Sequence, residues 1–375
     1  MLKMRIEEVR PGMVTARAIY DSDGKVLLNA GVGLKESYII RLKQLGFPAL
    51  YIDDGVSMGE AVNEVITPEL RIKTISTLRS AFTKVENNTR IDAALIKSAA
   101  NVIIEEIIAN RDVLVNVNDI RNYDNYTLGH SVNVCVLAVV TGKSLEYPPQ
   151  KLRELGVGAL LHDIGKMKIP TEILVKSDRL TPEEYELLKG HAAGGFEILR
   201  GYEEISALSA HVAYQHHERL NGTGYPRGLK GTEIHEFARL VAICDSFDAM
   251  TTDRIYKPGI SPSKALQTLE SLKNFQFDAE LVNAFMENIA LYPVGSMVVL
   301  STGEKGIVVD VHRNARNRPI VRLVLDKQGR RLADFVEIDL NKEHALSIVD
   351  VAEPKADLWE GREVRHGDPP AQSAG

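Results

Sequence analysis

The chain has 375 residues, of which 44% are hydrophobic and 26% are charged, and its formal net charge is −6. This length predicts two or three domains, and the negative charge argues against binding of a nucleic-acid polymer by the whole molecule. No apolar run approaches the roughly 18 residues of a membrane span, and the N-terminal residues lack a signal-peptide core. Cys135 and Cys244 lie in apolar surroundings, so we expect buried free thiols and a cytoplasmic protein.

The first 118 residues predict two accessory segments. The β-like runs MVTARAIY and KVLLNAG, the helical segment KESYIIRLKQLG and the strand PALYIDD indicate a small α+β module over residues 1–60, which could be regulatory. Residues 61–118 show apolar residues at helical spacing. We interpret them as a helical connector that could provide the surface of a homodimer.

The rest of the chain predicts one large helical domain and one small β module. Nearly every segment of residues 119–293 has helical spacing, whereas five short apolar or alternating segments over 294–351 predict a five-stranded, barrel-like unit. Residues 352–375 are polar and rich in Pro and Gly, so we expect disorder. The predicted fold is therefore mainly α, with a helical domain between a small α+β module and a small β-barrel-like module.

Histidines are concentrated in the helical region, where seven of the ten lie between residues 130 and 235. A lone histidine on an apolar helix is usually a hydrogen-bonded core residue, and His211 and His235 keep that interpretation because nothing pairs with them. The other residues form a set, since five helical segments each deliver a His or Asp from an apolar face. The set consists of His130, His162, Asp163, His191, His216, His217 and Asp245.

Metal ions would explain this set. Separate burial of so many polar groups would cost many kcal/mol, whereas metals neutralise carboxylates and take up imidazole lone pairs. A nitrogen and oxygen donor set without thiolates suits Fe, Mn or Zn. Because seven donors exceed the needs of one ion, we expect two divalent ions, with Fe or Mn preferred and Zn or others as alternatives.

The stretch LLHDIGKMKIP, residues 160–170, places Lys166 beside both His162 and Asp163 on a helix face. One interpretation is a polar cluster that caps a helix, with Gly165 as terminator and Pro170 shortly after it. The other is part of a metal-centred active site, and the remaining motifs favour the second.

Three motifs, HDIGK…IP, HHERLNGTGYPRGLKG and CDSFDAMTTDRIYK, resemble those of the HD-GYP family of cyclic-di-GMP phosphodiesterases, a subgroup of the HD metal-dependent phosphohydrolases. The resemblance covers about residues 119–292. It implies the same seven metal ligands, with Asp163 bridging the two metals. It also implies that Lys166 lies near the attacking water and the scissile phosphate.

The resemblance further implies that Tyr225, Arg254 and Lys257 hold the phosphates and guanines of the substrate. Gly222 and Gly224 would let the loop backbone approach the ligand and place Tyr225 in the cleft. The implied reaction opens cyclic di-GMP to linear pGpG, with slower conversion on to GMP, by attack of a metal-bridging hydroxide. Two alternatives stay open: a hydrolase of another cyclic dinucleotide or nucleotide, and a non-catalytic cyclic-di-GMP receptor.

A few positions differ from the commonest family pattern. Ala192 stands where a proline is frequent, and Leu220-Asn221 replace a frequent aromatic-Asp pair. Because neither position is a metal ligand, we expect these differences to adjust the activity of the site without abolishing it. Members with a third metal carry a Glu at the position of Tyr126, which favours two metals here. In HRNARNRP, the arginines at 313, 316 and 318 are similar to the arginine motif of PilZ-type receptors, but the second PilZ signature is missing, so we interpret a solvated basic turn.

Overall fold

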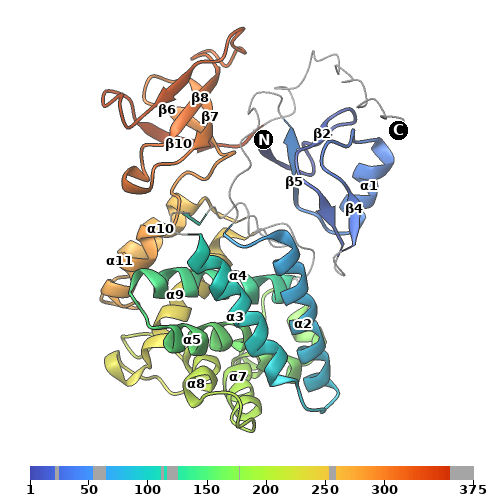
Figure 1. Cartoon of the computed structure of the whole chain (residues 1–375), viewed down its shortest axis with the longest axis vertical. Coiled ribbons are helices and arrows are strands. Elements are labelled where there is room, and N and C mark those ends of the chain that lie inside the picture. Colours follow the sequence, from blue (N-terminus) through green and yellow to red (C-terminus); the bar gives the residue numbers. More distant parts are fainter. Residues whose placement is uncertain are drawn as a thin grey trace, which may run out of the picture.

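The computed structural model describes residues 1–21, 25–53, 65–110, 114–115, 126–176, 178–252 and 259–354. Figure 1 shows a body of packed helices with two small units containing strands beside each other at one end. The predicted mainly α fold with two small flanking modules is confirmed. Among the helices described, none has both the length and the apolar character that a membrane crossing needs.

The helical body is built around α4 (Tyr126–Ser144), whose residues from 128 to 142 are all buried. A helix that is buried on all sides must be covered by neighbours. These neighbours are α2 (Pro68–Glu86), α3 (Ala93–Ala109), α5 (Pro149–Leu161), α9 (Glu236–Thr251) and α11 (Ala279–Glu287). The body is completed by η2 (Ile164–Lys168), α6 (Thr171–Leu174), α7 (Pro182–Leu199), α8 (Ala207–Gln215), η3 (Gly231–Glu233) and α10 (Pro262–Ser271).

Side-chain caps fix where several of these helices begin. Thr67 caps α2, and Thr181 forms a capping box with Glu184 at the start of α7. Ser206 caps α8, and it is followed within eleven residues by the two adjacent histidines. Such caps satisfy backbone N–H groups that have no partner within the helix. They therefore fix the start of α7, which carries His191, and of α8, which His216 and His217 follow.

The N-terminal unit contains a sheet of order β1-β5-β2, a short hairpin and one helix. Its elements are β1 (Leu2–Arg5), β2 (Val14–Thr15), β3 (Ile19–Tyr20), β4 (Val26–Leu28), α1 (Glu36–Gln44) and β5 (Ala49–Asp53). The sequence did not predict β1, which is only four residues long. It forms because Leu2 and Met4 are buried while the strand pairs with β5, which follows it by more than forty residues.

The C-terminal unit is a five-stranded antiparallel sheet of order β10-β6-β7-β8-β9, and each predicted strand segment contains one strand. The strands are β6 (Met297–Leu300), β7 (Lys305–Asp310), β8 (Ile320–Leu325), β9 (Glu337–Asp339) and β10 (Ile348–Ala352). Arg318 is not part of a solvated turn as predicted. Its guanidinium donates to the backbone carbonyls of Leu340, Glu343 and Leu346.

The two small units share one hydrophobic cluster. Leu2, Met4 and Ile52 of the N-terminal unit lie in the same buried cluster as Met297 and Ile307 of the C-terminal sheet. Figure 1 shows the two units next to each other above the helices. The predicted domain limits near residues 60 and 118, and most of the predicted disordered tail, fall outside the described residues, so these limits stay predictions.

Close packing of η2 against α7 brings the HD stretch to the third histidine segment. A Cβ on Gly165 would lie 2.0 Å from the carbonyl oxygen of His191 and 2.5 Å from the backbone nitrogen of Gly195. The helix-capping alternative for Gly165, which the motifs already disfavoured, does not describe its position. Helix α5 ends at Leu161 with His162 as its C-cap, and Gly165 lies inside η2, where it leaves room for α7.

We expect Gly165→Ala to lower the free energy of unfolding by about 1–3 kcal/mol, because the clash is with backbone that cannot rotate away. Gly156→Ala, in α5, is a matched control, since its Cβ would meet atoms no closer than 3.5 Å. Alanine is favoured over glycine in a helix by about 1 kcal/mol, so this variant should unfold at the same or a higher temperature. Thermal unfolding followed by circular dichroism measures both. Equal melting temperatures for the two variants would contradict this account.

Candidate metal centre

The seven predicted metal-ligating residues converge in the helical body from five segments of the chain. His130 lies in α4, His162 and Asp163 follow α5, and His191 lies in α7. His216 and His217 follow α8, and Asp245 lies in α9. Their donor atoms form two groups, and within each group these atoms lie within 4.8 Å of one another. The first group is Asp163, His191, His216 and His217, and the second is His130, His162 and Asp245.

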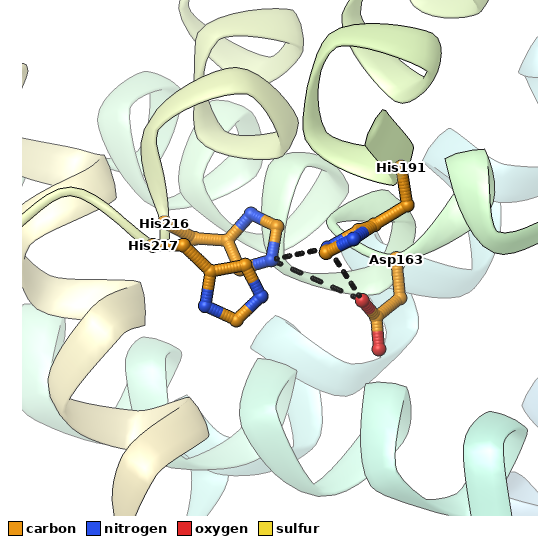
Figure 2. Close-up of side chains that lie close together, drawn as sticks. All are labelled: Asp163, His191, His216 and His217. Carbon is orange, nitrogen blue, oxygen red and sulfur yellow. Dashed lines mark hydrogen bonds and ion pairs between the residues drawn. The ribbon is translucent and has the colours of Figure 1, made fainter. Parts of the chain in front are cut away.

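Asp163 lies between the two groups. Its Oδ1 is 3.5 Å from His191 Nε2 and 3.9 Å from His216 Nε2. Figure 2 shows these side chains, with His217, pointing toward a common centre. Its Oδ2 faces the second group, at 3.4 Å from His162 Nε2 and 3.9 Å from His130 Nε2. The two oxygens of one carboxylate are thus divided between two sets of imidazoles.

Backbone carbonyls set the orientation of three imidazoles. The Nδ1 atoms of His162 and His191 each lie 2.7 Å from the carbonyl three residues earlier, those of Ala159 and Leu188. His216 Nδ1 lies 3.0 Å from the carbonyl of Ala213. Because a carbonyl only accepts, Nδ1 carries the proton and Nε2 keeps a lone pair that points to Asp163. Within the described part of the chain, His162 Nε2 is buried without a hydrogen-bond partner.

Neighbouring charges keep Asp163 ionised, and burial keeps the imidazoles of His191, His216 and His217 neutral. Burial raises the pKa of Asp163, but Lys166 and the imidazoles outweigh it and hold this pKa well below its usual range. Burial lowers the pKa of His191, lowers that of His216 well below its usual value, and lowers that of His217 to about 3. Metal binding requires deprotonated ligands. This donor set, with its unpartnered buried nitrogen, therefore fits divalent metal ions.

His130 differs because it lies between two carboxylates. Its Nε2 is 3.1 Å from Asp245 Oδ1, and its Nδ1 is 2.7 Å from Asp248 Oδ2. Burial lowers the pKa of His130, but these two carboxylates outweigh it and raise the pKa to about 10. The sequence reasoning missed Asp248. Its spacing of three residues from Asp245 on an apolar helix was a signal that could have found it.

Lys166 lies at the more exposed edge of the site. Its Nζ is 2.6 Å from Asp163 Oδ2, and a quarter of its side chain is accessible, whereas that of Asp163 is 2% accessible. The predicted proximity of these two residues is therefore present. The cation lies where it can meet both the buried carboxylate and an anion that enters from solvent.

The glycine-rich loop after His217 closes over the first group. The ring of Tyr225 stacks on His217, with centroids 4.7 Å apart and planes 30° apart. A Cβ on Gly224 would lie 2.4 Å from both His217 O and Glu218 Cα, so only glycine permits this approach. Arg254 and Lys257, the other two predicted substrate-binding residues, lie outside the described residues.

Glu218 holds this loop in place and was also missed by the sequence reasoning. Its side chain is buried, and its two oxygens accept hydrogen bonds from the backbone N–H groups of Arg227 and Leu229, at 2.8 and 3.0 Å. A buried carboxylate is costly unless it is paired or hydrogen-bonded. The adjacent HHE sequence could have indicated it, because a charged residue directly after two buried histidines needs a partner.

Two family models match the chain. One described as "HD domain" matches residues 103–281, and one described as "KOW domain associated with HD domain" matches residues 297–358. The first therefore covers most of the helical body that contains the site, and the second covers the C-terminal sheet.

The proteins that resemble the chain include two curated relatives and one solved structure. It is 33% identical over 293 residues to the cyclic di-GMP phosphodiesterase PA4108 of Pseudomonas aeruginosa, covering 77% of this chain and 70% of that protein. It is 40% identical over 178 residues to a cyclic di-GMP phosphodiesterase of Thermotoga maritima, covering 47% of this chain and 48% of that protein. Bd1817, a HDG"Y"P protein from Bdellovibrio bacteriovorus, aligns with a TM-score of 0.51 and 21% identity over 76% of this chain and 97% of that chain, which shows a shared fold. With its motifs, its helical body and these relatives, the chain belongs to the HD-GYP family of HD-domain metal-dependent phosphohydrolases.

Proposed function

We propose that the protein is a metal-dependent phosphodiesterase that hydrolyses cyclic di-GMP to linear pGpG, with slower conversion on to GMP. The observation that carries this proposal is the position of Asp163, whose two oxygens face separate groups of imidazoles while Lys166 lies beside it at the accessible edge. The two relatives above, both named as cyclic di-GMP phosphodiesterases, support the same substrate.

We assign the seven residues to two divalent ions, Fe or Mn in preference to Zn. His191, His216 and His217 would hold one ion, while His130, His162 and Asp245 would hold the other, and Asp163 would bridge them. The preference follows from a donor set of nitrogen and oxygen atoms without thiolates. When bound, two such ions lower the pKa of a coordinated water and neutralise charge on the scissile phosphodiester.

The remaining assigned residues act on the substrate. Lys166 would stabilise the negative charge that develops on the phosphoryl oxygens or the leaving group. Arg254 offers a bidentate fork for phosphate and Lys257 a point charge. Tyr225, which Gly224 allows to lie over His217, would present its ring to a guanine. The chain thus supplies charge beside the reacting phosphate and recognition at its periphery.

We also propose a cytoplasmic enzyme and a homodimer that uses the connector. Both cysteines are free and buried, as expected in a reducing compartment. Helix α3 leaves Leu95, Val102 and Ile108 exposed, which supports a contact between copies.

Substitutions of Asp163 and Lys166 should distinguish loss of metal from loss of catalysis. Protein purified without oxygen should hold about two equivalents of Fe or Mn, and Asp163→Ala should lose metal and turnover together. Lys166→Ala should keep the metals and lose roughly 100-fold or more in turnover, as when one donor to a transition-state oxyanion is removed. Lys168→Ala is a matched control, because Lys168 is an exposed lysine of the same short helix. Elemental analysis and chromatography of pGpG measure both effects, and a wild-type rate for Lys166→Ala would disprove its role.

Arg254→Ala should weaken handling of cyclic di-GMP by roughly 10- to 150-fold, since a charge-assisted bidentate contact is worth about 1.5–3 kcal/mol. The metals should stay bound, and hydrolysis of bis(p-nitrophenyl) phosphate should change far less. Arg200→Ala, at a surface ion pair with Glu197, controls for loss of a positive charge. If both substrates slow equally, Arg254 supports the fold or the chemistry and not dinucleotide recognition.

The same assay with other cyclic dinucleotides tests the substrate. If another cyclic dinucleotide is turned over faster, that dinucleotide and not cyclic di-GMP is the substrate. Tight binding of cyclic di-GMP by metal-loaded protein that releases no product would instead indicate a receptor.

Glu218→Gln should loosen the loop that carries Tyr225. The carboxylate accepts one backbone hydrogen bond at each oxygen, whereas the amide NH2 that replaces one oxygen cannot accept, so one backbone N–H would lose its partner. The expected result is about tenfold weaker handling of cyclic di-GMP with unchanged metal content, in line with about 1–3 kcal/mol for an unsatisfied buried group. Hydrogen exchange of residues 222–230 should accelerate. Glu233→Gln is the control, because Glu233 also accepts from a backbone N–H but is exposed. Unchanged exchange in Glu218→Gln would show that this carboxylate does not hold the loop.

A further inference from the structure

A chain of buried hydrogen bonds leads from helix α2 to the imidazole of His130. Arg71 Nη1 donates to Asn133 Oδ1 at 2.8 Å, and Asn133 Nδ2 donates to Asp248 Oδ1 at 3.0 Å. Asp248 Oδ2 in turn lies 2.7 Å from His130 Nδ1. This series of hydrogen bonds connects three helices, since Arg71 lies in α2, Asn133 and His130 lie in α4, and Asp248 lies in α9.

The donor and acceptor roles in this chain have one solution. A guanidinium only donates and a carboxylate only accepts, so the amide of Asn133 must present its oxygen to Arg71 and its nitrogen to Asp248. Asp248 must then accept from His130 Nδ1–H. Nε2, which faces Asp245 Oδ1 at 3.1 Å, is then the ring nitrogen whose lone pair becomes available to a metal ion when it loses its proton.

The orientation of the His130 ring depends on tertiary contacts, in contrast to that of three other imidazoles of the site. The rings of His162, His191 and His216 are oriented by carbonyls of their own chain segment, three residues earlier. The ring of His130 is oriented by a carboxylate on another helix, which is itself oriented by Asn133 and Arg71. All three supporting side chains are buried, and Arg71 is 2% exposed. An arginine is rarely buried to this extent without paired groups.

We propose that Arg71 is a positioning residue for the metal site, acting through Asn133 and Asp248 on His130, so that the packing of α2 sets the metal affinity. This inference rests on the proposed function, because it takes His130 as a metal ligand. Residues of this kind, which orient the ligands, typically change metal affinity by roughly 10- to 100-fold when they are replaced.

The direction in which metal affinity changes on substitution distinguishes a positioning role of Arg71 from a purely electrostatic one. Replacing Arg71 by methionine removes a positive charge from the neighbourhood of the site, and Coulomb's law alone would then predict tighter binding of a cation. Loss of positioning predicts weaker binding. Asn133→Asp provides a second case, because it adds a negative charge but removes the donor to Asp248, while it can still pair with Arg71.

The experiment uses the full-length protein, stripped of metal and titrated anaerobically with Mn²⁺ by calorimetry, with Mn²⁺ electron paramagnetic resonance as the independent readout. Arg71→Met and Asn133→Asp should each bind Mn²⁺ roughly 10- to 100-fold more weakly than wild type, and Arg71→Lys should recover part of the loss. Thr74→Val is the matched control, because Thr74 is buried one turn further along α2 and bonds to its own helix at Leu70 O. It should bind as wild type does.

A double-variant comparison tests the route. If Arg71 acts through Asp248, then Arg71→Met should cost little further affinity in an Asp248→Asn background, whereas independent effects would add. Additive losses, or Mn²⁺ binding at wild-type strength or tighter in Arg71→Met and Asn133→Asp, would overturn the proposal. Should Arg71→Met fail to fold, Asn133→Asp alone decides. A wild-type protein that takes up no divalent ion would instead overturn the proposed function, and this inference with it.

Discussion

The negative charge of Asp163 is buried where α4, α5, α7, α8 and α9 meet, and the arrangement of the helical body follows from how this charge is compensated. A carboxylate with 2% exposure can remain ionised only beside positive or hydrogen-bonding partners. Lys166 provides one partner at the accessible edge, and imidazoles provide the others. A divalent ion bound here would complete this compensation, because it would accept the carboxylate oxygens and the imidazole lone pairs together.

The positions of the imidazoles come from two different sources. For His162, His191 and His216, the local helical geometry is sufficient, because a carbonyl three residues earlier fixes each ring. For His130, the ring is fixed by Asp248, whose own orientation depends on Asn133 and on Arg71 in α2. The contrast suggests where the site can be adjusted. The hydrogen-bonded route from α2 thus ends at His130 and at none of these three rings.

The two small units pack against each other. They share a hydrophobic cluster, which includes Leu2 and Met4 on one side and Met297 and Ile307 on the other. Arg316, beyond the end of the helical body, donates to the carbonyl of Ile289 at 3.4 Å. Helix α2 is the first described helix after the N-terminal unit. The C-terminal unit therefore contacts both the N-terminal unit, through the shared core, and the helical body, through Arg316.

The sequence by itself determined the helical body, the five C-terminal strands and the set of histidines and aspartates, because spacing and local motifs carry that information. It could not determine β1, whose four residues form a strand only by pairing with a distant partner. It could not show why residue 165 is a glycine, since the close approach of α7 involves residues of a separate segment. Tertiary structure alone decided that Asp248, Asn133 and Arg71 support His130 and that Glu218 holds the loop, because burial and hydrogen-bond partners arise only when helices distant in sequence pack together.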